Sequence, residues 1–517
     1  MTQVPVSIAQ HYHQRTKYDP DTLSQQAPGL DWSQQPVPYK SYPLGAAVDL
    51  KPFLQGGATT PASGEGSPEL RAAERTWWRR LSHFLVSSYG LTAKVMTPSE
   101  PVYLRAAPSA GGLYPAEVYL ISRGTSLLPA GLYNYQVRSH SLLRFWDDHP
   151  WPALQSACFW HPALENTQLA LVVTSVFQRS AWRYRARAYR RILLDSGHLL
   201  GNLELVGSLC DYRPHLIGGF IDQAINQLLY LEAEQEGAIA VLALADLLEV
   251  DQNLALGRTA LPSSTHASYP ELEGDELLPY LHQVSQIPPD PDLTLSQGRP
   301  EATPPPDKYQ LPFGDKVSTQ TPPINWGDGL AQLNSTILRR RSTRRYTGAN
   351  LPLATLLQVL DFTYHPAHYR DQGLDAQPDF FDLSLIETFV AVSGITGLEP
   401  GCYYYAPQAQ TLRQVRFKQF RDALHYLCLG QDLGRDAAAV IFHTADLTQA
   451  IDRYGDRAYR YLHLDAGHLG QRLNLAAIGL KLGVSGIAGF FDDQVNDVLG
   501  IPEDEAVLYV TTLGQRE

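Results

Sequence analysis

The stretch RAYRRILLDSGHLLGNLEL, residues 187–205, recurs as RAYRYLHLDAGHLGQRLNL at residues 457–475. The segment that follows is repeated as well, since LIGGFIDQAINQLL (216–229) matches GIAGFFDDQVNDVL (486–499). Every residue precedes its counterpart by the same 270 positions, as His198 precedes His468. A register that holds through both pairs excludes insertions in either copy and indicates a duplicated domain.

Each copy combines helical and extended patterns. The repeated stretch has leucines at helical spacing, and a Gly-Phe turn, a second helix and a β-rich run such as EAVLYVTTLG (505–514) follow it. Apolar runs such as EVYLISR (117–123) and AAVIFHTA (438–445) predict strands earlier in each copy. We therefore expect an α+β fold, in which a mixed sheet flanked by helices occurs twice and the copies form an intramolecular pseudo-dimer.

Composition limits the class of protein. The chain has 517 residues, 44% of them hydrophobic and 18% charged, which is typical of globular domains and too long for one core. A net charge of -12 argues against a nucleic-acid partner. The four cysteines form no CxxC motif, so we expect neither a metal site nor disulfides. Without a signal-like start or a membrane-spanning apolar run, we expect a soluble, cytoplasmic protein with no membrane association.

Proline and glycine divide the chain into segments. Residues 287–326 are dense in proline and are expected to form a semi-extended connector, and residues 55–70 are rich in glycine, serine and threonine. The expected units are an N-terminal segment (1–70), a degenerate first domain (71–286), the linker (287–326) and a ligand-binding second domain (327–517).

The two copies carry different motifs. The second begins with LRRRSTRRYTG (338–348), in which Arg340, Ser342 and Arg344 offer two guanidinium groups and a hydroxyl suited to a phosphate. The first copy has PSAGGLYP (108–115), whose small residues allow close approach of backbone N–H groups to a ligand. Alone, the first motif also fits a solvated basic helix start, and the second a hairpin turn. A pocket between the copies explains why each motif occurs once.

Five motifs in order, RRSTRRY, PSAGGLYP, LGQ, LDAGH and GIAGFFDD, resemble the FMN-dependent nitroreductase superfamily, in particular its SagB/McbC branch of azoline oxidases. HYHQRTKY (11–18) and DWSQQPVPYKSYP (31–43) are similar to the N-terminus of that branch. The resemblance covers nearly the whole chain except the connector, and it is closest to cyanobactin-type thiazoline oxidases with two fused copies.

This resemblance implies FMN as the cofactor, bound where two subunits meet. One side would supply the phosphate grip already described, with Gln431 at the ribityl chain or ring edge and Arg516 as a late basic group. Ala488 and Gly489 would present backbone N–H groups to flavin N5. The opposing wall would be the residues of the Pro-Ser turn, namely Pro108, Ser109, Ala110 and Gly111. The mirror-related site should be inactive, because the first copy lacks the grip, the LGQ motif and the late arginine.

The resemblance also implies oxidation of peptide thiazolines and oxazolines to azoles, with a base beside the flavin. Bacterial members use a Lys-Tyr pair before the long helix, where this chain has Arg460-Tyr461 and Arg190-Arg191. Because arginine is not an ordinary base, we expect Tyr461, assisted by Arg460, to be catalytic. The alternative is that both pack at a helix start. His198 and its counterpart are expected to be structural, because they occur in both copies.

Three further points concern substrate and partners. Tyr114 and the cluster SAWRYRARAYRR (180–191) are candidates for the substrate wall, although the cluster also fits a basic helix face. The expected partners are a heterocycle-containing peptide and molecular oxygen, and pairing of two chains into a homodimer is left open. The competing functions are an NAD(P)H-dependent nitro or quinone reductase and a non-catalytic peptide-binding scaffold.

Overall fold

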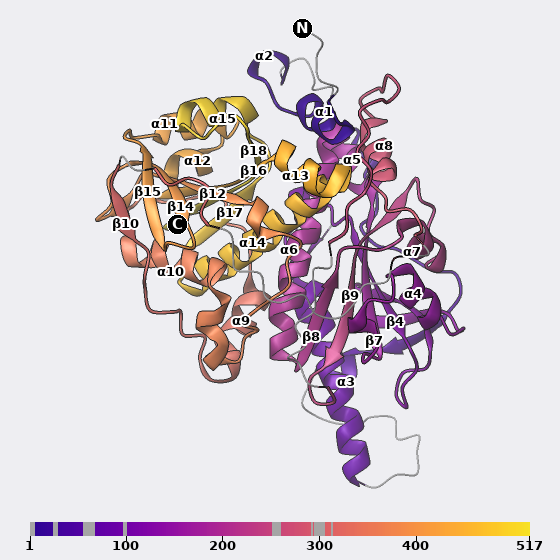
Figure 1. Ribbon diagram of the computed structural model, residues 1–517. Helices are drawn as coiled ribbons and strands as arrows, with labels where there is room; N and C mark the ends of the chain where they lie inside the picture. The colour runs from indigo at the N-terminus through magenta and orange to yellow at the C-terminus, as the bar shows by residue number, and fades with distance from the viewer. Residues whose placement is uncertain are drawn as a thin grey trace.

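The computed structural model describes residues 6–23, 29–54, 68–96, 101–250, 260–290, 293, 306–311 and 314–517. Most of the glycine-rich segment 55–70 and the centre of the proline-rich segment lie outside these residues. Figure 1 shows two sheets, one from each half of the chain, separated by two long helices. The expected α+β tandem repeat is confirmed.

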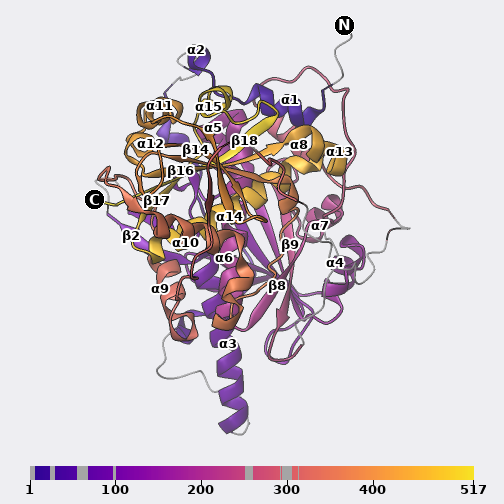
Figure 2. The ribbon, with the colours of Figure 1, turned by 60° about the vertical axis from the view of Figure 1, so that its left-hand side comes forward.

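The first half contains, in chain order, α1 (Ile8–Arg15), α2 (Pro20–Leu23), β1 (Ala46–Asp49), α3 (Pro68–Tyr89), β2 (Leu91–Val95), β3 (Val102–Arg105), β4 (Ala116–Ser122), β5 (Gly131–Gln136), β6 (Ser141–Trp146), α4 (Trp151–Ala157), β7 (Leu169–Val176), α5 (Phe177–Tyr184), α6 (Ala188–Leu209), β8 (Tyr212–Ile217), α7 (Asp222–Leu228) and β9 (Glu236–Asp246). In both views α3 projects from the lower end of the molecule (Figures 1 and 2).

The second half contains α8 (Leu277–Val284), β10 (Lys316–Ser318), α9 (Ala331–Arg339), β11 (Leu351–Pro352), α10 (Leu353–Tyr364), β12 (Glu387–Val392), β13 (Ile395–Thr396), β14 (Gly401–Ala406), β15 (Thr411–Arg416), α11 (Arg421–Leu427), α12 (Asp432–Asp436), β16 (Ala439–Asp446), α13 (Leu447–Tyr454), α14 (Ala458–Gly479), β17 (Gly483–Ile487), α15 (Asp492–Leu499) and β18 (Glu505–Gly514).

The two large sheets have the same strand order. It is β1-β6-β5-β4-β7-β9-β8 in the first half and β10-β15-β14-β12-β16-β18-β17 in the second. Every pairing between neighbouring strands of these two sheets is antiparallel, where the sequence analysis expected mixed sheets. Apolar runs locate strands but carry no signal of their relative direction, which explains the difference.

The edge strands revise the expected linker. Lys316–Ser318 lies within the proline-rich segment, yet it forms β10 and pairs with β15 as β1 pairs with β6. Ala46 and Lys316 are separated by the same 270 positions as the rest of the repeat. The C-terminal part of segment 287–326 therefore belongs to the second sheet and does not act only as a connector.

One core joins the halves. α6 and α14 pack against each other, and nearly all residues of both helices are buried. A helix that is buried on all sides is expected between two layers rather than on a surface. The largest apolar cluster includes both helices and the facing sides of both sheets, whereas smaller clusters lie beneath α4 and α7 and beneath α11 and α15. No described helix has the length and apolar character needed to cross a membrane.

Candidate active site

A pocket between the halves collects residues that the sequence divides between the copies. Its walls come from the turn before β4, from α6, from the loop after α9, and from α14, β17 and β18. The lining residues are Pro108, Ser109, Ala110, Gly111, Arg191, Leu194, Asp195, His198, Ser342, Arg344, Asn474, Ser485, Gly486, Ala488 and Tyr509. The Pro-Ser turn therefore faces two residues of the expected phosphate grip.

The grip residues have different environments. Ser342 and Arg344 lie in the loop after α9 and line the pocket. Arg340 is buried, and its guanidinium donates to the carbonyls of Ala106 at 2.6 Å and Arg105 at 3.2 Å. Burial lowers the pKa of Arg340 to about 10. Within the described part of the chain its Nη1 has no hydrogen-bond partner, so Arg340 both positions the backbone before the Pro-Ser turn and keeps one donor available.

The Pro-Ser turn is held by a carboxyl group on α6. Ser109 Oγ donates to Asp195 at 2.5 Å, and the Ala110 N–H donates to the same side chain at 3.0 Å. Gly111 follows with a φ of 66°, a conformation that favours glycine. Burial raises the pKa of Asp195 to about 7 despite these donors. This carboxyl is a functional residue that sequence reasoning missed, although it belongs to the LDSGH repeat.

A histidine on the same helix links this wall of the pocket to the second half. His198 of α6 lies 2.8 Å from the Tyr509 hydroxyl through Nε2 and 2.9 Å from Gln471 Oε1 through Nδ1. Burial lowers the pKa of His198 to about 3, so the ring is neutral. Its contacts join the halves, which agrees with the structural role expected from the sequence.

The glycine-rich end of β17 forms the opposite side. A Cβ on Gly486 would lie 1.8 Å from the Tyr509 hydroxyl, so no side chain fits there. Ala488 lines the pocket and Gly489 follows it. A Cβ on Gly489 would lie 3.1 Å from Leu429 Cδ1 and 3.8 Å from both Arg191 Nη2 and Tyr18 Cε2. Tyr18 and Arg191 therefore border the segment expected to face flavin N5.

Four expected cofactor residues are not among the lining residues: Arg340 and Gly489, described above, and Gln431 and Arg516. Gln431 is exposed, and its side-chain amide donates to the carbonyl of Cys428 at 2.9 Å. Arg516 is exposed and forms an isolated antiparallel β-bridge with Tyr346, which follows Arg344 of the grip by two residues. Their roles toward the cofactor stay predictions.

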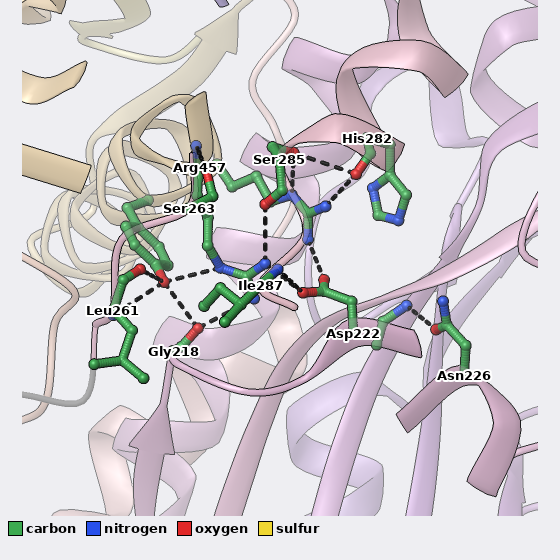
Figure 3. A network of polar contacts seen from close by, with 12 residues as sticks. Gly218, Asp222, Asn226, Leu261, Ser263, His282, Ser285, Ile287 and Arg457 are labelled. Atoms are coloured by element: carbon green, nitrogen blue, oxygen red, sulfur yellow. Dashed lines mark hydrogen bonds and ion pairs between the residues drawn. The ribbon is translucent and has the colours of Figure 1, made fainter. Parts of the chain in front are cut away.

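The expected catalytic pair requires a correction, because the structure places it at the mirror-related position. Figure 3 shows a network in which Arg457 and Asp222 are labelled. Arg460 is buried and its guanidinium donates to Asp222 at 2.7 Å. The Tyr461 hydroxyl lies 2.9 Å from the Gly218 carbonyl, and burial raises its pKa. Neither Arg460 nor Tyr461 lines the pocket that holds Ser342 and Arg344. The order of residues in the sequence does not reveal this placement. α6 of the first half borders the pocket that holds the grip of the second half, and α14 of the second half borders Gly218 and Asp222 of the first.

At the mirror-related position, bulky side chains fill the space that corresponds to the Pro-Ser turn, while a cavity lined by Glu204, Asp379 and His468, among others, remains beside it. Phe380 stacks on His468 with ring centroids 4.2 Å apart, and Phe381 stacks on Tyr461 at 4.8 Å. A Cβ on Gly219 would lie 2.4 Å from Leu261 Cγ. These side chains occupy the space that corresponds to the Pro-Ser wall, which supports the expectation of one functional site.

The pocket fits an anionic cofactor. Arg191 and Arg344 line it, and the buried Nη1 atoms of Arg191 and Arg340 have no hydrogen-bond partner among the residues that the structure describes. Unpaired buried donors are costly, and a phosphate supplies acceptors for them. Among the described residues, no group of His, Cys, Asp and Glu could hold a metal ion, and all four cysteines are buried and free.

The chain belongs to the nitroreductase family, whose profile matches residues 74–245 and 337–515. FMN is the cofactor that this membership supports, as the sequence analysis expected. A crystal structure described as a nitroreductase from Anabaena variabilis is 61% identical, covers 99% of this chain and 100% of its own, and superposes with a TM-score of 0.92.

Two curated relatives match single regions. A nitroreductase of Methanocaldococcus jannaschii is 28% identical over 191 residues, which is 37% of this chain and 93% of the relative. The microcin B17-processing protein McbC of Escherichia coli is 24% identical over 180 residues, which is 33% of this chain and 62% of that protein. The match to McbC supports the likeness to the SagB/McbC branch.

Proposed function

We propose that the chain is an FMN-dependent oxidase that converts thiazolines or oxazolines in a ribosomal peptide to the corresponding azoles. The observation that carries this proposal is the composite pocket, in which the Pro-Ser turn of one copy faces Ser342 and Arg344 of the other. The similarity to McbC, a protein that processes microcin B17, favours a peptide substrate. Molecular oxygen as final acceptor and a cytoplasmic location complete the proposal.

The residues around the pocket would bind different parts of FMN. Ser342, Arg344 and the free donor of Arg340 would bind the phosphate of FMN, and the backbone of Ala488 and Gly489 would face the ring system. Ser109, fixed by Asp195, would support the other face. When bound, FMN accepts two electrons and a hydrogen from the substrate. The protein must orient the heterocycle and accept the proton that leaves the neighbouring ring carbon.

The competing function is an NAD(P)H-dependent nitro or quinone reductase, which the family membership also allows. Stopped-flow measurement of flavin absorbance under anaerobic conditions separates the two. We expect a peptide that contains a thiazoline to bleach the flavin and NADPH to leave it oxidised. Rapid bleaching by NADPH without bleaching by the peptide would identify a reductase. A purified chain that takes up no FMN would identify a binding scaffold.

A further inference from the structure

The residues around Tyr18 form a basic cluster beside the proposed flavin site. Tyr18 follows α1 and is half-buried, and it forms an isolated parallel bridge with Phe491 next to the GIAGF segment. Its hydroxyl accepts from Arg191 Nη2 at 3.3 Å, and the guanidinium of Arg187 lies 4.2 Å from its ring centroid. Together with Leu429, Tyr18 and Arg191 are also the side chains nearest to Gly489.

We propose that Tyr18 is the catalytic base of the oxidation and that Arg191 is the positioning residue that keeps its phenolate available. This inference rests on the proposed azoline oxidase function. The azoline ring loses one hydrogen as a proton to Tyr18 Oη and the other, with two electrons, to the flavin. The ring gains a double bond, and Tyr18 then releases its proton to solvent.

Charge around Tyr18 favours this role. Arg187 and Arg190 both donate to Asp492, at 2.8 Å and 2.6 Å, so two guanidinium groups share one carboxylate. Arg191 adds a third positive charge, and no described residue accepts a hydrogen bond from its Nη1. The cluster therefore carries an excess of positive charge beside the phenols of Tyr18 and Tyr184, and of these two it is Tyr18 whose hydroxyl accepts a hydrogen bond from Arg191, which stabilises its ionised form.

The remaining groups on the neighbouring elements do not cancel this excess. Asp195 faces Arg191 from the next turn of α6, but burial raises its pKa to about 7 and keeps it largely protonated below neutral pH. Lys17 pairs with Asp493 at 2.5 Å, and burial raises the pKa of Tyr184. Burial by itself would raise the pKa of Tyr18, yet Arg191, Arg187 and Arg190 together hold it below its ordinary value.

The mirror-related site lacks this arrangement. Ile287 takes the place of Tyr18, because it bridges Ile221 as Tyr18 bridges Phe491. Tyr461 takes the place of Arg191 at the separation of the repeat. The phenol therefore lies on the long helix at the mirror-related site, and on the N-terminal segment beside the pocket that holds the grip, where it is half-buried.

The test compares Tyr18→Phe with Tyr269→Phe, which removes a hydroxyl near α1 that donates to the Val6 carbonyl at 3.2 Å. The ultraviolet absorbance of tyrosinate is followed against pH in the cofactor-free protein. We expect one early-ionising tyrosine in the wild type and in Tyr269→Phe, and its loss in Tyr18→Phe. Arg191→Gln should move that ionisation to higher pH, which a purely structural role would not do.

The second readout is turnover of a thiazoline peptide at full FMN occupancy. Loss of a general base lowers kcat by about 10²–10⁴-fold, so we expect that decrease in Tyr18→Phe and none in Tyr269→Phe. Wild-type kcat should rise with pH through the Tyr18 ionisation. Unchanged kcat in Tyr18→Phe, or identical tyrosinate titrations in both variants, would overturn the proposal. A wild-type protein that shows the early ionisation but does not oxidise the peptide would refute the azoline oxidase function, and the base role with it.

Discussion

Gly197 of α6 and Gly467 of α14 meet at the crossing of the two long helices. A Cβ on Gly197 would lie 2.9 Å from the Cα of Gly467 and 2.2 Å from the carbonyl oxygen of Leu464. A Cβ on Gly467 would lie 2.4 Å from the carbonyl oxygen of Leu194. The two glycines are counterparts in the repeat, so the pseudo-twofold axis passes through a contact that allows no side chain.

Gly467→Ala should lower the free energy of unfolding by about 1–3 kcal/mol, because the added methyl group forces the helices apart. Chemical denaturation measures the change. Gly274→Ala is the matched control, since a Cβ at Gly274 meets nothing within 4 Å. Equal stability of the two variants would show that the crossing adapts without cost.

The purified chain should contain one FMN. Among the described residues, one pocket combines the Pro-Ser turn with the grip, and Phe381 and Leu261 crowd Gly218 and Gly219 at the mirror-related position. Flavin released by denaturation, divided by the concentration of polypeptide, gives the ratio. A value near two would mean that the filled site opens to accept a second cofactor.

Arg344→Ala should weaken FMN binding by roughly ten- to a hundredfold, because one charge-assisted contact contributes about 1.5–3 kcal/mol. Arg345→Ala is the control, since Arg345 is exposed and does not line the pocket. Equilibrium titration of the cofactor-free protein with FMN measures both affinities. The grip assignment fails if the two variants bind FMN equally well.

Gly489→Val should reduce FMN binding or turnover, because its side chain would extend toward Arg191 and Tyr18. Gly219→Val should retain FMN and lose only stability, because its side chain would displace Leu261 in the filled site. Bound flavin, turnover and circular dichroism are compared for both. Loss of flavin from a folded Gly219→Val protein alone would place the active pocket in the other half.

Asp195 should make the stability of the cofactor-free protein depend on pH. Its pKa is raised from 3.8 to about 7 in the folded protein, so the folded state binds more protons than the unfolded state between these values. Stability from this group is complete below pH 3.8 and is lost as pH rises toward 7. Relative to Asp195→Asn, the wild type should therefore lose up to about 1.4 kcal/mol per pH unit in that window.

Urea unfolding at several pH values measures this difference. Asp452→Asn, on the exposed side of α13, should preserve the slope of the wild type. Parallel curves for the wild type and Asp195→Asn would show that the buried carboxyl ionises as freely as in the unfolded chain.

The duplication, the α+β class and the two motif-bearing walls could be predicted from the sequence because the repeat keeps a fixed register through its longest helix. The start of the repeat could not. α1 and α8 occupy corresponding places, since His13 and His282 both accept from an arginine through their carbonyls. Their sequences share only a His-Gln pair within IAQHYHQR and LLPYLHQV, which is too little to detect.

The parts of the site that a single short motif supplies could be predicted from the sequence. The parts that depend on which half a helix contacts could not. Ser109 and Ser342 belong to short motifs and reach the same pocket. Arg460 and Tyr461 lie in the half that carries the grip, yet they serve the opposite side because α14 crosses α6. Tyr18 was hidden for the same reason, because it is far from Gly489 in sequence and borders it only through the fold of the N-terminal segment.

The exchanged ion pairs have a consequence for cooperativity. Arg190 of the first half donates to Asp492 of the second, and Arg460 of the second donates to Asp222 of the first, with all four side chains buried. In a half expressed by itself, these buried guanidinium groups would lack their carboxylate partners. The unpaired buried charge would lower the free energy of unfolding by several kcal/mol. The chain should therefore unfold in a single transition, and two separately produced fragments should become stable only by assembling with each other.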